Sequence, residues 1–281
     1  MDVKGAYLNG KLKEKVYMRQ PDGYNDRTGR VCLLLKTLYG LKQAGHVWNK
    51  EFDDQLKELG FKSLLSDPCA YIQQNGNDIE IITDWVDDLL LFASSHILME
   101  KMKHDLRSKW EMTDLGEPTK IVGIEITLKP AVITLTQTQY IEGILKRERM
   151  DTANPVSTPM DPNERLEPNP DGGEGNRSNS YARLLRELQF LANATRPDIA
   201  YAVNRLAAYT ANPSLQHTGA LKQILRYLSG TRSYSITYMT PPGPSENKNI
   251  FFGYANATYA NTDNYKSTSG HIFIVNRGMI T

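Results

Sequence analysis

Two adjacent carboxylates, Asp87 and Asp88, are the residues of this sequence best suited to chemistry. They stand between two apolar runs, residues 79–84 and 89–92, whose Ile, Leu and Phe content is typical of short strands. A strand–Asp-Asp–strand hairpin holds two like charges at a tight turn, which is costly without a cation or another charge partner. Asp2 supplies a third carboxylate at the start of the chain. A solvated Asp-Asp turn is the alternative that this pattern alone leaves open.

The elements that must position these carboxylates follow from hydrophobic periodicity. Apolar residues recur every three or four positions over residues 38–59, which predicts a helix. The same reasoning predicts helices at 97–111, 137–150, 181–194, 198–211 and 214–229. Strands are predicted at 31–35, 69–74, 79–84, 89–92, 121–126, 132–135, 235–239, 250–254 and 270–275. Residues 151–180, rich in Pro, Gly, Asn and Asp, predict an extended or disordered linker.

Composition narrows the class of protein. The 281 residues include 40% hydrophobic and 23% charged residues, which is ordinary for a globular protein. The net charge of +1 provides no global basic field, so any nucleic-acid site would be a local patch. Cys32 and Cys69 have no paired spacing and predict neither a disulfide framework nor a zinc site. No apolar run reaches the roughly 18 residues that a membrane span needs, so no membrane partner is expected.

Several motifs occur in a specific order along nearly the whole chain. They are MDVKGAYLNG (1–10), VYMRQPDGY (16–24), LYGLKQAGHVW (38–48), WVDD (85–88), DLG (114–116), VGIEI (122–126), TRPDIAYAV (195–203) and ILRYLSGT (224–231). In this order they resemble the reverse transcriptase of copia-type LTR retrotransposons. KSTSG (266–270) resembles the beginning of the ribonuclease H domain of the same polyprotein.

The resemblance implies an α+β fold built on a right-hand polymerase palm, which is an antiparallel sheet with helices. Residues 1–150 would form the palm and part of the thumb, with the fingers missing. Residues 151–180 would be the linker and 181–232 a helical connection. Residues 233–281 would be a truncated ribonuclease H-like segment with a partial sheet.

The resemblance also implies an active site. Asp2, Asp87 and Asp88 would be the catalytic carboxylates and would hold two Mg²⁺ ions, with Mn²⁺ as a substitute and the Val3 carbonyl as a further ligand. The reaction would be nucleotidyl transfer from deoxynucleoside triphosphates to a DNA primer on an RNA template. The rest of the polyprotein would be the protein partner.

Three residues match nucleotide-binding positions of the family. Tyr7 lies five residues after Asp2, where an aromatic steric gate would exclude a ribose 2′-hydroxyl, and Lys42 and Gln43 would lie against the incoming nucleotide. The alternative for Tyr7 is an aromatic ring packed beside the strand. The alternative for Gln43 is an exposed helix N-terminus.

Trp85, Val122 and Gly123 match positions that contact the primer and template, and Gly123 would allow close approach of the backbone. Trp85 stands where the family usually has Tyr. Asp84 stands where the family usually has an apolar residue, and it is expected to place a further carboxylate near the metals.

The C-terminal segment departs further from the family. Asn256 and Thr258 replace the two carboxylates with which the ribonuclease H domain opens, and a neutral amide is a poor Mg²⁺ ligand. Ribonuclease H activity is therefore predicted to be absent.

The function predicted from the sequence is that of an RNA-directed DNA polymerase fragment of a retrotransposon. Little or no activity is expected of the isolated chain, because the fingers are missing and several motifs depart from the family pattern. The alternative is a non-catalytic nucleic-acid-binding remnant of a decayed element. A metal-dependent phosphatase or nuclease would explain the Asp-Asp turn but not the ordered motifs. The sequence does not specify a compartment, and the resemblance implies cytoplasmic particles or the nucleus.

Overall fold

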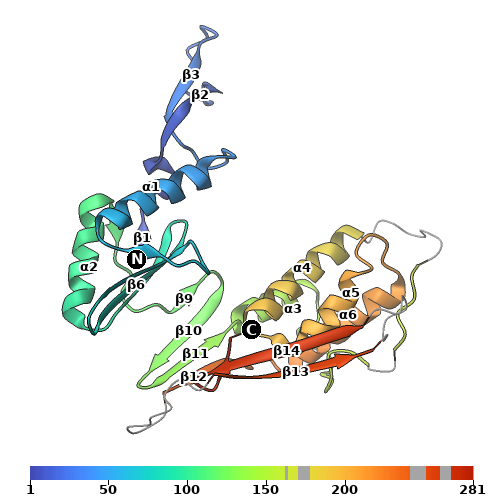
Figure 1. Cartoon of the computed structure of the whole chain (residues 1–281). Helices are drawn as coiled ribbons and strands as arrows, with labels where there is room; N and C mark the ends of the chain where they lie inside the picture. The colour runs from blue at the N-terminus through green and yellow to red at the C-terminus, as the bar shows by residue number, and fades with distance from the viewer. Residues whose placement is uncertain (162–163, 170–177, 241–250, 260–266, 281) are drawn as a thin grey trace. The chain divides into compact units, whose positions relative to one another are not determined.

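The computed structural model describes residues 1–161, 164–169, 178–240, 251–259 and 267–280 (Figure 1). The chain divides into two compact units, Met1–Pro118 and Thr119–Thr281. The boundary falls inside the segment 1–150 that the resemblance assigns to the palm and partial thumb. Each unit has a hydrophobic core of its own.

The first unit is a six-stranded antiparallel sheet with two helices. In chain order its elements are β1 (Asp2–Val3), the 3₁₀ helix η1 (Ala6–Asn9), β2 (Lys11–Arg19), β3 (Val31–Lys36), α1 (Ala44–Glu58), β4 (Lys62–Ser63), β5 (Ala70–Asn75), β6 (Asp78–Trp85), β7 (Asp88–Ala93), α2 (His96–Lys109) and β8 (Met112–Thr113). The sheet order is β4-β5-β6-β7-β1-β8. The two-residue strand β1 therefore lies in the interior of the sheet, between β7 and β8.

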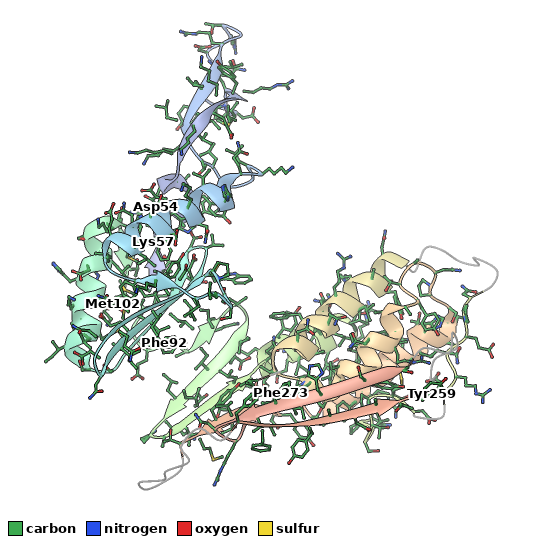
Figure 2. All side chains as sticks on the ribbon, in the orientation of Figure 1. Asp54, Lys57, Phe92, Met102, Tyr259 and Phe273 are labelled. Atoms are coloured by element: carbon green, nitrogen blue, oxygen red, sulfur yellow. The ribbon has the colours of Figure 1, made fainter. Side chains whose placement is uncertain are left out.

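The core of the first unit lies between this sheet and the two helices. Trp48, Phe52 and Leu56 recur every four residues on α1, so they share one face of the helix, and all three are buried. They join Met102 on α2, labelled in Figure 2, and Leu89 on β7. The predicted helix 38–59 begins only at Ala44, because Gly40 is left-handed at φ +94° and residues before Ala44 form turns.

Strands β2 and β3 pair with each other as a separate two-stranded sheet. The sequence predicted β3 but no strand at 11–19, because the alternating charges of KLKEK carry no buried face. In the structure, Tyr17 and Leu33 are register partners and both are exposed. Strand β2 is therefore extended where it pairs with β3, and not because one of its faces is buried.

The second unit combines helices with two antiparallel sheets. Its elements are β9 (Lys120–Ile121), β10 (Ile124–Lys129), β11 (Val132–Thr136), α3 (Thr138–Arg147), α4 (Ser178–Ala194), η3 (Pro197–Ile199), α5 (Ala200–Ala207), α6 (Leu215–Gly230), β12 (Ile236–Met239), β13 (Phe252–Thr258), β14 (Thr268–Val275) and β15 (Gly278–Met279). One sheet has the order β12-β11-β10-β9 and the other the order β13-β14-β15. The helices share one core, which also takes in Leu166 from the predicted linker.

Two sequence predictions in the second unit need correction. The predicted strand 121–126 is two strands, β9 and β10, because Val122 and Gly123 are both left-handed and turn the chain. The predicted helix 198–211 is the 3₁₀ turn η3 followed by α5, which ends at Ala207. Beyond it the amides of Tyr209 and Thr210 bond to carbonyls three residues back, which tightens the chain before Pro213. Within the described part of the chain, no helix is long and apolar enough to cross a membrane.

Candidate active site

The Asp-Asp pair lies at the tip of the β6–β7 hairpin. Trp85 and Asp88 are register partners, so Val86 and Asp87 form a two-residue turn. Val86 is left-handed at φ +63°, a conformation that strains a β-branched residue. The indole Nε1 of Trp48 donates to the Val86 carbonyl at 3.0 Å. Helix α1 thus holds the strained turn from the core side.

Strand β1 brings the third carboxylate to this tip. Asp2 is the register partner of Asp88, although 86 residues separate them in the sequence. The Val3 amide donates to the main-chain carbonyl of Asp87 at 2.7 Å, and the Leu89 amide donates to the Met1 carbonyl at 2.8 Å. Direct partners on antiparallel strands present their side chains on the same face. The backbone therefore places Asp2 and Asp88 side by side, with Asp87 next to them.

The carboxylates occupy the sheet face that the two helices leave open. Leu89 is buried in the core, so Asp88 before it points to the opposite face. Trp85, which pairs with Asp88, is exposed, as is Phe92 further along β7 (labelled in Figure 2).

Asp84 does not join this group, which corrects the expectation of another carboxylate near the metals. It alternates with Trp85 along β6 and pairs with buried Leu89, so its side chain faces the core. It is 9% exposed. Burial raises the pKa of Asp84 to about 6, although a hydrogen bond from the Val86 amide and the charge of Asp67 act in opposite directions on it. Asp84 is thus a destabilising buried carboxylate behind the turn.

Asp87 is held by two donors. Its Oδ1 atom accepts a hydrogen bond from the Ala6 amide at 2.8 Å and another from the Tyr39 hydroxyl at 2.6 Å. Partial desolvation of the hydroxyl, together with the hydrogen bond to Asp87 and the charge of that carboxylate, raises the pKa of Tyr39 to about 12. The rings of Tyr39 and Tyr7 lie 4.7 Å apart at 42°. Asp87, Tyr39 and Tyr7 therefore form one connected group.

The donor set suits Mg²⁺ because hard carboxylate oxygens are the ligands that this ion prefers. The strand register sets Asp2 beside Asp88, and Asp87 precedes Asp88 in the hairpin turn. Across the residues that the structure describes, no group of three or more His, Cys, Asp or Glu side chains is arranged to hold a metal ion. Asp87 Oδ1 is already bonded to protein donors, whereas Oδ2 of Asp87 accepts no hydrogen bond within the described residues.

The predicted nucleotide-binding residues lie in two segments, η1 and the stretch that leads into α1. Tyr7 is in η1, and its carbonyl accepts a hydrogen bond from Thr37 Oγ1. A side chain at Gly45 would begin 3.6 Å from the Tyr7 hydroxyl, so glycine leaves that space open. Gln43 stands at the N-cap of α1 and its side chain donates to Glu14 at 3.4 Å, while Lys42 is exposed. The structure thus places Tyr7, but not Gln43, in contact with the Asp87 group.

Comparison with known proteins identifies the family. A sequence profile described as reverse transcriptase (RNA-dependent DNA polymerase) matches residues 1–162, more than half of the chain. The chain belongs to the reverse transcriptase family. The resemblance deduced from the ordered motifs is therefore confirmed.

Proteins of transposons match most or all of the chain. The retrovirus-related Pol polyprotein from transposon TNT 1-94 of Nicotiana tabacum is 36% identical over 100% of this chain and 22% of its own length. The corresponding polyprotein from transposon RE1 of Arabidopsis thaliana is 38% identical over 97% of this chain and 18% of its own length. A putative transposon Ty5-1 protein of Saccharomyces cerevisiae is 32% identical over 85% of this chain and 78% of its own length. The chain thus spans about a fifth of the two plant polyproteins, and no solved structure matches it.

The remaining predicted residues of this reverse transcriptase family member lie in the second unit. Val122 and Gly123 form the left-handed turn between β9 and β10, and a side chain at Gly123 would begin 3.6 Å from the Phe190 ring. Asn256 and Thr258 are exposed on β13. Their roles, as primer contact and degenerate ribonuclease H site, stay predictions.

Two residues that shape the site had no role assigned from the sequence. Tyr39 was part of a matching motif, but nothing in its spacing indicated a bond to a residue 48 positions away. Trp48 belongs to the apolar pattern that predicts the helix; it packs in the core, and its indole N–H also bonds to the Val86 carbonyl. A buried Trp needs a hydrogen-bond acceptor, and that rule was the available signal.

Proposed function

We propose that this chain carries the palm active site of an RNA-directed DNA polymerase that works by two-metal nucleotidyl transfer. The observation that carries the proposal is the pairing of Asp2 with Asp88 beside Asp87 on the open face of the sheet. The family match supports the same reaction. Ordered motifs alone would also fit a remnant, but the intact carboxylate group favours catalysis.

The chain's own residues would do three things. Asp2, Asp87 and Asp88 would supply the oxygens that hold divalent cations beside the primer end. Bound Mg²⁺ would assist the attacking 3′-hydroxyl and neutralise charge on the triphosphate and the leaving pyrophosphate. The Tyr7 ring would exclude a ribose 2′-hydroxyl. Trp85, 60% exposed beside Asp88, would pack against the primer.

Primer extension tests the proposal. The purified chain is incubated with an RNA template, an annealed DNA primer, deoxynucleoside triphosphates and Mg²⁺. We expect slow extension that Asp87→Asn reduces at least a hundredfold, because the substitution removes an anionic ligand. Asp78→Asn at the exposed start of β6 is the matched control and should leave extension unchanged.

The alternative function gives a different result. A nucleic-acid-binding remnant should hold an RNA–DNA hybrid equally well with and without Mg²⁺ and should extend no primer. That combination, or extension that survives Asp87→Asn, would overturn the proposed function.

A further inference from the structure

The two carboxylate oxygens of Asp87 have different environments. Oδ1 accepts from the Ala6 amide at 2.8 Å and from the Tyr39 hydroxyl at 2.6 Å. Each carboxylate oxygen has about two acceptor sites, so these two donors occupy Oδ1. Within the described residues, Oδ2 accepts no hydrogen bond. Only Oδ2 is therefore free to meet a cation.

The two donors come from different kinds of structure. Ala6 is buried at the start of η1, and its amide is fixed by the backbone. Tyr39 lies in the turn between β3 and α1, beside left-handed Gly40, and it is 51% exposed. Its hydroxyl is thus the side-chain contact of Oδ1, whereas the Ala6 amide is the main-chain contact.

Contact with Tyr7 fixes the position of the Tyr39 ring. The two ring centroids are 4.7 Å apart and tilted by 42°, a geometry that is favourable for aromatic pairs. One side chain therefore contacts both the Asp87 carboxylate, through its hydroxyl, and the Tyr7 side chain, through its ring. Tyr39→Phe removes only the hydroxyl and Tyr39→Ala removes the whole ring, so comparing the two variants separates these contacts.

We propose that Tyr39 is a positioning residue for Asp87. With the Ala6 amide it occupies Oδ1, so that Asp87 presents Oδ2 alone to the divalent cation that accompanies a deoxynucleoside triphosphate. Through its ring, Tyr39 also keeps Tyr7 in place for nucleotide selection. The inference deepens the proposed function and rests on it, because it requires a cation at Asp87.

Metal binding in the absence of nucleic acid is the first test. Mn²⁺ is titrated into the full chain, and free Mn²⁺ is followed by electron paramagnetic resonance. Hydrogen-bond partners of metal ligands typically change metal affinity ten- to a hundredfold. We therefore expect Tyr39→Phe to weaken Mn²⁺ binding about tenfold. Asp87→Asn should weaken it further, because the substitution removes the carboxylate itself. Tyr17→Phe, at an exposed position on β2, is the matched control and should bind as the wild type does.

An unchanged or tighter Mn²⁺ affinity in Tyr39→Phe would overturn the inference, and a tighter one would show that the hydroxyl competes with the ion. Tryptophan fluorescence during thermal unfolding establishes that each variant is folded. The Phe ring keeps the packing of Tyr39, so a metal-specific loss in a folded variant is not a general structural effect.

Primer extension separates failure of the inference from failure of the proposed function. If Tyr39→Phe extends the primer as fast as the wild type and with the same Mg²⁺ requirement, the proposed function stands and the inference is overturned. A wild-type chain with neither extension nor Asp87-dependent Mn²⁺ binding overturns both. We expect Tyr39→Ala, but not Tyr39→Phe, to reduce the preference for deoxynucleotides over ribonucleotides. Equal preference in both variants would overturn the role of the ring.

Discussion

Replacement of Asp84 by Asn should stabilise the first unit at neutral and alkaline pH. Asp84 is buried behind the catalytic turn, and its pKa is raised to about 6 from an ordinary value of 3.8. Above pH 6 the folded protein must keep a charge that burial disfavours. The difference of about two pH units, at 1.36 kcal/mol per unit, corresponds to about 3 kcal/mol. Partial access of water lowers the expected gain to about 2 kcal/mol.

The effect should depend on pH in one direction. Between pH 4 and 6 the folded state keeps a proton on Asp84 that the unfolded state has released, so wild-type stability falls as pH rises through this window. The Asn variant carries no such proton and can still accept the bond from the Val86 amide. We therefore expect the advantage of Asp84→Asn to be about 2 kcal/mol at pH 8 and to approach zero at pH 4.

Urea unfolding followed by tryptophan fluorescence is a specific assay for this effect. The three tryptophans of the chain, Trp48, Trp85 and Trp110, all lie in the first unit, so their emission reports that unit. Asp78→Asn at the exposed end of the same strand is the matched control and should change stability little at any pH. A destabilised Asp84→Asn variant at pH 8, or a gain that is the same at pH 4 and pH 8, would refute the burial argument.

Three further changes test other buried polar groups. Trp48→Phe should lower the free energy of unfolding by about 2 kcal/mol, because it leaves the Val86 carbonyl without its donor and removes core volume. Urea unfolding followed by circular dichroism measures this change. A decrease below about 0.5 kcal/mol would contradict the prediction. Arg196 is 1% exposed and donates to Asp198 and to the Thr231 carbonyl and hydroxyl. Arg196→Lys should lower the free energy of unfolding by about 3 kcal/mol, because an ammonium group cannot reproduce the planar set of guanidinium donors. Loss of helix content in urea measures the change, and wild-type stability would contradict the prediction. Burial lowers the pKa of His217, whose Nδ1 accepts a hydrogen bond from the Ser214 amide. The stability of the second unit should therefore fall as pH drops below about 6.5, and His217→Gln should weaken that pH dependence. A pH profile shared by both proteins would exclude His217 as the cause.

The sequence predicted most helices and strands because their apolar residues repeat with the right period. The spacing of Trp48, Phe52 and Leu56 was enough for α1, and the Ile-rich run for β6. Boundaries were less accurate where backbone conformation decided them, as at left-handed Gly40 and at the Val122-Gly123 turn. Strand β2 was missed because strand pairing, not burial, accompanies its extended form.

Periodicity could not predict the pairing of Asp2 with Asp88. No local pattern specifies a contact across 86 residues, and only the family resemblance suggested it. Neither approach predicted the face on which Asp84 lies or the reach of Tyr39 to Asp87, because both depend on the register of the hairpin and on the turn before α1. Register determines which side chains share a face, and it becomes visible only when strands are paired.

The left-handed conformation of Val86 has a consequence for dissection of the protein. A β-branched residue in this conformation is unfavourable on its own, and the turn is held by the Trp48 indole and by pairing with β1. A synthetic peptide of residues 78–93 lacks both supports, so it should not keep the Asp-Asp geometry even if its strands pair. The smallest piece able to present these acids therefore includes residues 1–3 and α1 as well as the hairpin. Transfer of the four residues Trp85 to Asp88 to another hairpin would therefore not reproduce the positions of the two carboxylates.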